Sequence, residues 1–134
     1  MGASPRQQQF VQDAEICVDA AKKTYGIDLS YDLASIKKLD EIIEDMGKPT
    51  NLAQMVLIFG AFLGEAIRRL YKGKWEWNDH YKTWAVTFPV AKGGEDGAFV
   101  FAKVRKRFVD GSGDSLYFYI VVIDGWVTGK IEPR

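Results

Sequence analysis

Residues 51–73, NLAQMVLIFGAFLGEAIRRLYKG, decide the fold of this chain of 134 residues. Apolar side chains occupy almost every position of the stretch, so a helix that begins at Thr50 or Asn51 and ends before Gly73 has almost no polar face. A helix that is apolar all round is buried, and we expect it to be the centre of the domain. Its longest apolar run, 55–64, is about half as long as a membrane span needs to be. The stretch therefore predicts a core helix.

Two more helices are predicted upstream of this central helix. Ser4 and Pro5 are typical of an N-cap followed by proline at the first helical position, and Gly26 is typical of a helix end. Asp32 can cap a second helix, which Gly47 would end. Each helix has an apolar stripe at helical spacing: Phe10, Ala14, Cys17, Ala21 and Tyr25 in the first, and Leu33, Ile36, Leu39, Ile43 and Met46 in the second.

Downstream of the central helix the composition changes to aromatic and β-branched residues, which favour strands. Residues 75–77 and 83–90 are predicted to form a hairpin. The glycine-rich stretch 93–97 is predicted to be a loop, and 98–101 a further strand. Three helices followed by these strands predict an α+β fold, with the buried third helix packed on a small antiparallel sheet.

The segment 102–122 is compatible with two structures. The pattern around Val104 and Phe108 fits both a helix face and the alternation of a strand. Residues 111–115 could cap a last helix, whereas 116–123 contain enough Tyr, Phe, Ile and Val for a strand. The residue pattern alone leaves both structures open, so one or two further C-terminal helices are an alternative to more sheet.

Size and composition predict a single domain over residues 1–134, with loosely ordered ends at 1–8 and 126–134. The 18 basic and 18 acidic residues cancel, so no overall charge attracts nucleic acid or an anionic membrane. The polar first residues are not typical of a secretory signal, and we expect a cytoplasmic protein. Cys17 and His80 are each single, so one chain provides neither a disulfide nor a Cys/His zinc site, and no cofactor is predicted.

Three segments together resemble an uncharacterised family of small bacterial domains, a domain of unknown function with a G-x-x-x-G-E helix and a Trp-containing hairpin. The segments are GAFLGE at 60–65, KW at 74–75, and VRKR at 104–107 followed by Gly111 and DSL at 114–116. The resemblance covers about residues 30–121 and depends on the order and spacing of the segments. It implies helices at about 102–109 and 115–122, and it carries no established reaction.

Gly60, Gly64 and Glu65 form one candidate site on the central helix. The two glycines share one face, where they allow either close packing or a groove for a ligand. A carboxylate at the end of an apolar run must be desolvated or paired, so we expect an ion pair of Glu65 with Arg105 or Arg107. The alternative is a general base with a raised pKa. No second catalytic group accompanies Glu65, so no catalytic residue is predicted and enzyme activity stays an open question.

The hairpin and the basic segment after it supply the other candidate binding residues. Alternation turns Trp75 and Trp77 to one face, which is core if it meets the central helix and a binding surface if it faces solvent. Positive charge concentrates beside Phe108, in Lys103, Arg105, Lys106 and Arg107. Such a patch could contact phosphates, but the chain lacks the net basic charge that is typical of nucleic-acid-binding proteins.

These observations favour a non-catalytic binding or accessory protein that contacts another protein through the Trp hairpin and residues 103–107. Aromatic and charged contact residues are plentiful, whereas coupled catalytic groups are missing. The alternative is a small enzyme or small-ligand-binding protein with a pocket at Gly60, Gly64 and Glu65. A weaker alternative is association with nucleic acid, and we expect no association with a membrane.

Overall fold

The computed structural model describes residues 4–131. The elements follow in the order α1 (Pro5–Tyr25), α2 (Leu33–Met46), α3 (Leu52–Leu70), β1 (Lys74–Asn78), β2 (Thr83–Pro89), β3 (Glu95–Ala98), α4 (Val100–Asp110), the short 3-10 helix η1 (Ser112–Asp114) and α5 (Leu116–Thr128). The predicted α+β fold, with three helices before a small antiparallel sheet, is confirmed. None of the helices within residues 4–131 combines the length and the apolar character that crossing a membrane requires.

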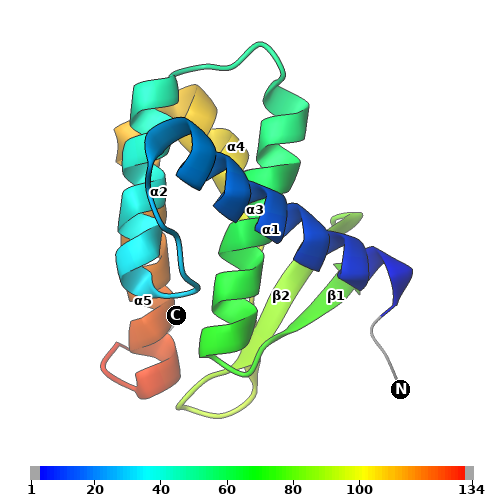
Figure 1. Cartoon of the computed structure of the whole chain (residues 1–134). Coiled ribbons are helices and arrows are strands. Elements are labelled where there is room, and N and C mark those ends of the chain that lie inside the picture. The colour runs from blue at the N-terminus through cyan, green and yellow to red at the C-terminus, as the bar shows by residue number, and fades with distance from the viewer. Residues whose placement is uncertain (1–3, 132–134) are drawn as a thin grey trace.

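Helix α3 runs through the centre of the molecule, as Figure 1 shows. α1 crosses α3 on one side and α4 packs against it on another, while α2 and α5 lie together at one flank and the sheet at the opposite flank. The buried residues of α3 run from Val56 to Ile67. One hydrophobic cluster joins residues of all five helices and all three strands. The prediction that the third helix is the buried centre is therefore confirmed.

The first two helices begin and end at the predicted residues because their caps are local. Ser4 and Gln7 form a capping box, in which each side chain accepts a hydrogen bond from the other residue's backbone N–H, and Pro5 occupies the first helical position. Gly26 ends α1 with φ of 67°, a left-handed conformation that favours glycine. The Asp32 carboxylate accepts a hydrogen bond from the first turn of α2.

The sheet has the strand order β1-β2-β3, and both pairs are antiparallel. Trp75, Val86 and Ala98 lie side by side in the register and are buried on the face that meets the helices. The hairpin of β1 and β2 agrees with the sequence prediction. Trp75 lies on the inner face of the hairpin and packs against the core, so it is not accessible to a partner.

The third strand differs from the prediction, which was wrong at both of its ends. β3 begins at Glu95, inside the stretch predicted to be a loop, because Val90 N–H donates to the carbonyl of Gly94 and closes the turn earlier. Gly93 and Gly94 have positive φ, so the two glycines supply the left-handed positions of this turn. The strand ends at Ala98, because α4 begins at Val100.

The segment after the sheet is helical, so the strand alternative for 116–123 is wrong. α4 and α5 cover the two ranges in which the family resemblance implied helices. The Ser115 hydroxyl accepts a hydrogen bond from Phe118 N–H at 3.1 Å and caps α5. β propensity depends strongly on the surroundings, and here packing of α5 on α2 outweighs it.

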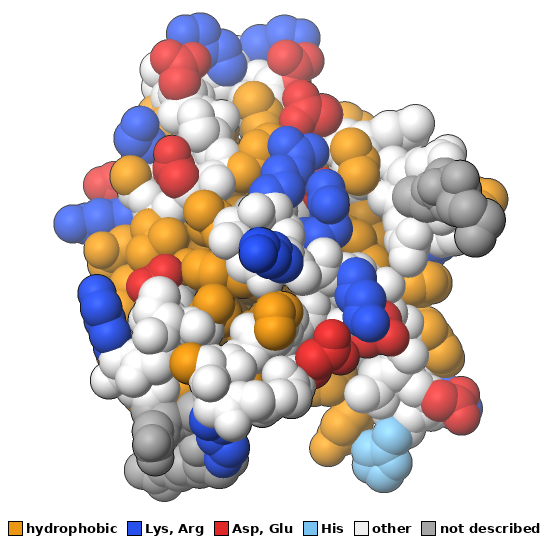
Figure 2. All heavy atoms as spheres, turned by 90° about the horizontal axis from the view of Figure 1, so that it is seen from below, with side chains coloured by type: hydrophobic (Ala, Val, Ile, Leu, Met, Phe, Trp, Pro, Cys, Tyr) orange, Lys and Arg blue, Asp and Glu red, His pale blue; other side chains and the backbone are white. Residues whose placement is uncertain are grey.

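Exposed large hydrophobic residues occur on several elements, among them α1, α3, the hairpin, α4 and α5. Figure 2, a view from below, shows hydrophobic side chains gathered on the side where α2 and α5 lie. α5 is apolar on nearly all sides, and its Phe118 is 69% exposed.

The chain ends also differ from the prediction of loose order at 1–8 and 126–134. Residues 5–8 belong to α1, and 126–128 belong to α5. Gln7 is tied to the sheet, since its Nε2 donates to the Trp75 carbonyl at 3.1 Å. Residues 1–3 and 132–134 of that prediction lie outside the described residues.

Candidate functional site

The Glu65 carboxylate is fully buried at the C-terminal half of α3 and is enclosed by donors. Arg68 binds it with two groups, Nε to Oε2 at 2.7 Å and Nη2 to Oε1 at 2.8 Å. Arg69 Nε donates to Oε1 at 3.1 Å, and Trp75 Nε1 donates to Oε2 at 2.8 Å. Both arginines lie one helical turn along α3, where side chains three and four residues apart face each other. The four residues form what we term the Glu65 network.

This network overturns two expectations for Glu65. The predicted ion pair with Arg105 or Arg107 is wrong, because Arg68 and Arg69 occupy the carboxylate. The alternative of a raised pKa is also wrong. Burial acts to raise the pKa of Glu65, but the hydrogen bonds from Arg68 and Trp75 and the charges of the two arginines outweigh it and lower the pKa. An ionised carboxylate with every lone pair engaged is not poised as a general base.

The two glycines of α3 provide close packing and no groove. A Cβ added at Gly64 would lie 2.1 Å from Trp75 Cη2, and one added at Gly60 would lie 2.4 Å from Phe101 Cδ1. The rings of Trp75 and Phe101 therefore rest directly on the helix backbone. The groove that the two glycines could have left open is filled by these rings.

A shallow hollow does lie at the edge of the Glu65 network. It has a volume of about 270 Å³ and its lining includes Gln7, Arg68, Lys74 and Trp75. Glu65 contributes to its wall, but the carboxylate oxygens already bind four donor groups. The hollow thus has no free carboxylate for chemistry.

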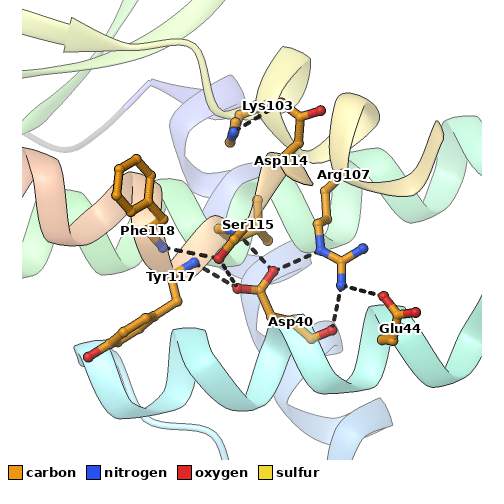
Figure 3. Close-up of polar contacts among 9 residues, drawn as sticks. Asp40, Glu44, Lys103, Arg107, Asp114, Ser115, Tyr117 and Phe118 are labelled. Carbon is orange, nitrogen blue, oxygen red and sulfur yellow. Dashed lines mark hydrogen bonds and ion pairs between the residues drawn. The ribbon is translucent and has the colours of Figure 1, made fainter. Parts of the chain in front are cut away.

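Arg107 belongs to a second, separate network that is centred on Asp40 of α2 (Figure 3). Arg107 Nε donates to Asp40 Oδ1 at 3.0 Å. The same carboxylate accepts from the Ser115 hydroxyl at 2.9 Å and from the backbone N–H groups of Leu116 and Tyr117 at 2.9 and 2.8 Å. Asp40 therefore caps the positive end of α5 from another helix, and we term this group the Asp40 network.

The basic segment is divided between the interior and the surface. Arg107 is only 4% exposed, and Lys103 is half-buried, with its Nζ 3.4 Å from Asp114 Oδ1. Arg105 and Lys106 are exposed. The predicted binding segment thus contributes two accessible cations, because every third or fourth residue of a helix faces the core.

The two tryptophans of β1 also have different surroundings. Trp75 is 4% exposed and packs on Phe10 of α1, with ring centroids 4.3 Å apart. Trp77, on the same face two residues further, is 49% exposed. Alternation correctly places both on one face, but that face extends past the helices at Trp77. Of the two tryptophans predicted as binding residues, Trp75 belongs to the core and Trp77 lies at the surface.

Trp77 belongs to a group of aromatic side chains at the end of the hairpin, which we term the hairpin-tip cluster: Trp77, His80, Tyr81, Trp84 and Phe99. Tyr81 is 65% exposed. Trp77 and Trp84 meet edge to face at 6.0 Å, and Tyr81 meets Phe99 in the same way at 5.2 Å. In Figure 2 hydrophobic side chains lie beside the pale blue histidine. The cluster is thus exposed and also held by contacts between its own rings.

Comparison with models of protein families, with curated proteins and with solved structures gave no match. The resemblance to a family of small bacterial domains therefore stays a prediction. Within residues 4–131 no group of three or more His, Cys, Asp or Glu side chains is arranged to hold a metal ion.

Sequence reasoning missed two of these features. The role of Asp40 had no signal in the sequence, since an aspartate followed by a glutamate in an amphipathic helix is typical of a solvated face. Phe99 follows the glycine-containing β3, and nothing in the sequence indicated that it contacts the hairpin. Its contact with Tyr81 depends on the pairing of β3 with β2, which no local pattern near Phe99 indicates.

Proposed function

We propose that this chain is a non-catalytic binding protein that contacts another protein through the hairpin-tip cluster. The observation that carries the proposal is the exposure of Trp77 and Tyr81, two large rings that remain open to water while neighbouring Trp75 is buried. Leaving such rings exposed forgoes about 25 cal/mol for each Å² of apolar surface that burial would remove from water. Trp and Tyr are also the residue types that contribute most to the centres of protein interfaces.

The geometry of the hairpin tip supports the proposal, because its rings are held in place before any partner arrives. Tyr81 N–H donates to Asn78 Oδ1 at 2.8 Å, and Lys82, with φ of 53°, completes the turn. Edge-to-face contacts with Trp84 and Phe99 restrict the two exposed rings. Rigid rings lose little conformational entropy on binding, which is the advantage of a preorganised surface.

The charges around the cluster favour a protein partner over nucleic acid. Asp79 and Lys82 form an exposed ion pair at 2.9 Å, so the turn carries no excess positive charge. Within the basic segment only Arg105 and Lys106 are exposed, and binding to phosphates needs several such contacts on one surface. The partner we infer presents an apolar pocket with polar groups at its rim.

Crosslinking tests the proposal directly. A photoreactive benzophenone residue replaces Tyr81 in one variant and Phe118, an exposed aromatic residue of α5, in another. We expect a discrete crosslinked partner from position 81, and we expect Trp77→Ala to abolish it. Crosslinks from position 118 alone would contradict the proposal and would move the contact surface to α5.

Trp77→Ala must itself leave the fold intact for this test, and its matched control is Phe118→Ala. Phe118 is 69% exposed, so its removal is expected to change the free energy of unfolding by at most about 0.5 kcal/mol. Trp77 is 49% exposed and contacts Trp84, so its removal is expected to lower the free energy of unfolding by about 1 kcal/mol. A partner lost to the same extent in both variants would argue against a specific role for the hairpin tip.

A further inference from the structure

A cavity of about 200 Å³ lies between α1, α2 and α3, and no residue of the hairpin-tip cluster lines it. In Figure 1 this is the region where the C-terminal half of α1 crosses α2 and α3. Its floor is made of five buried side chains, Cys17, Ala21, Leu39, Ile42 and Phe59. Small residues of α1 thus face large ones of α2 and α3, and the packing leaves space between them.

The floor of the cavity carries no charge. Cys17 is a free cysteine, and burial raises the pKa of its thiol well above the usual range, so the sulfur is neutral. A neutral thiol is a small hydrophobe with weak hydrogen-bonding ability. The other four floor residues are hydrocarbon side chains.

The rim of the cavity is partly open and adaptable. Met46 and Met55, the two methionines within the described residues, both lie at the rim and are half-buried. Unbranched thioether side chains adjust to irregular shapes. Ala20 and Thr24 are exposed at the rim, so no bulky side chain at these positions closes the entrance. Oxygen atoms occur in the lining side chains only at Thr24 and Tyr25.

These features define the occupant by its chemistry. A buried water needs two to four polar partners, and the floor of this cavity offers only the weakly hydrogen-bonding Cys17 thiol. A dry apolar cavity of about 150 Å³ is large enough to hold benzene. Drug-sized ligands need about 300 Å³ or more. We propose that the cavity binds a neutral apolar small molecule of the size of a substituted benzene or a short hydrocarbon chain. This site is separate from the protein-binding surface proposed above.

Toluene is the probe that tests the site, with benzoate as a control of similar size that carries a charge. The full chain is labelled with ¹³C at the methionine methyl groups, and Met46→Leu and Met55→Leu assign the signals. We expect toluene to shift the signals of Met46 and Met55 in a saturable way at about millimolar concentration. Benzoate is expected to leave them unchanged, because burying its charge without a partner is unfavourable.

A variant that closes the entrance connects the shifts to this cavity. Ala20→Phe places a ring at the exposed rim, and we expect it to weaken toluene binding about tenfold or more, whereas Ala34→Phe, at an exposed position of α2 outside the lining, changes it less than about twofold. We expect Thr24→Trp, at a second exposed rim position, to weaken toluene binding to the same extent as Ala20→Phe. Toluene shifts that are absent, that persist in both rim variants, or that benzoate reproduces would overturn the proposal.

Discussion

The Glu65 network and the Asp40 network each hold a carboxylate with arginine, but they connect the chain over different distances. The partners of Glu65 lie three, four and ten residues away, within α3 and the start of β1. The side-chain and backbone partners of Asp40 lie 67 to 77 residues away, in α4 and at the start of α5. The first network therefore lies within one continuous segment of the chain. The second forms only when α2 packs against α4 and α5.

The two networks also differ in what their arginines can do alone. The side chains of Arg68 and Arg69 are 35% and 37% exposed, so they can turn toward water if Glu65 is lost. The side chain of Arg107 is 5% exposed and has no such route. Removing one partner of a buried pair is costly when the other is stranded. We therefore expect the Asp40 network to be the more sensitive of the two.

The largest effect is expected for Asp40→Ala. The change leaves Arg107 Nε without its carboxylate, so that Arg107 keeps only Glu44 and the backbone carbonyl of residue 40, and it leaves the first N–H groups of α5 without an acceptor. We expect it to lower the free energy of unfolding by about 3–5 kcal/mol. Urea denaturation measures the loss. The matched control is Glu44→Ala, one turn further along α2, since Glu44 also binds Arg107 but is exposed. Similar losses in both variants would contradict a central role for Asp40.

Glu65→Gln is expected to have the next largest effect. It places an amide N–H₂ among donors and leaves Trp75 Nε1 or one arginine without its acceptor, a loss of about 1–3 kcal/mol in the free energy of unfolding. The same substitution at Glu41, an exposed residue of α2, is the control. A loss larger than that of Asp40→Ala would reverse the comparison between the two networks.

Trp75→Phe tests the one contact of the Glu65 network that extends beyond α3. Phe keeps one aromatic ring but loses the Nε1 donor and part of the indole that packs on Gly64, so we expect a decrease of about 1–2 kcal/mol in the free energy of unfolding. Trp77→Phe, on the same strand and face, is the control and is expected to be neutral because its ring is half exposed. Equal effects would mean that the hydrogen bond to Glu65 contributes nothing.

The smallest effect is expected from acid. The folded-state pKa of Glu65 is lowered from 4.5, so its contribution to stability is complete above the unfolded pKa and is lost as pH falls through the lower folded value. Protonation keeps the side chain in place, so it perturbs less than a substitution. Urea denaturation between pH 7 and pH 3 should show that the difference in the free energy of unfolding between wild type and Glu65→Gln decreases as the pH falls. A constant difference would contradict the lowered pKa.

The parts of the fold that could be predicted from the sequence are those that depend on local features. Ser4, Pro5, Gly26 and Asp32 mark helix ends through contacts within a few residues, so α1 and α2 were assigned from pattern alone. The turn before β3 was misplaced, because two adjacent glycines at 93 and 94 shorten a loop that composition made longer. The candidate site was predicted only in part. Of the two tryptophans predicted as binding residues, Trp77 is exposed and Trp75 is buried.

By itself, the sequence determined the apolar central helix, the caps of the first two helices and the alternation that puts Trp75 and Trp77 on one face. Each depends on neighbours within one or two turns or on strand period. Only the tertiary structure decided that 116–123 is a helix, that Arg107 pairs with Asp40, and that the helices cover Trp75 and stop short of Trp77. The physical reason is that burial and long-range pairing depend on which elements pack together. A contact between residues that are 67 to 77 positions apart produces no pattern in the sequence around either residue.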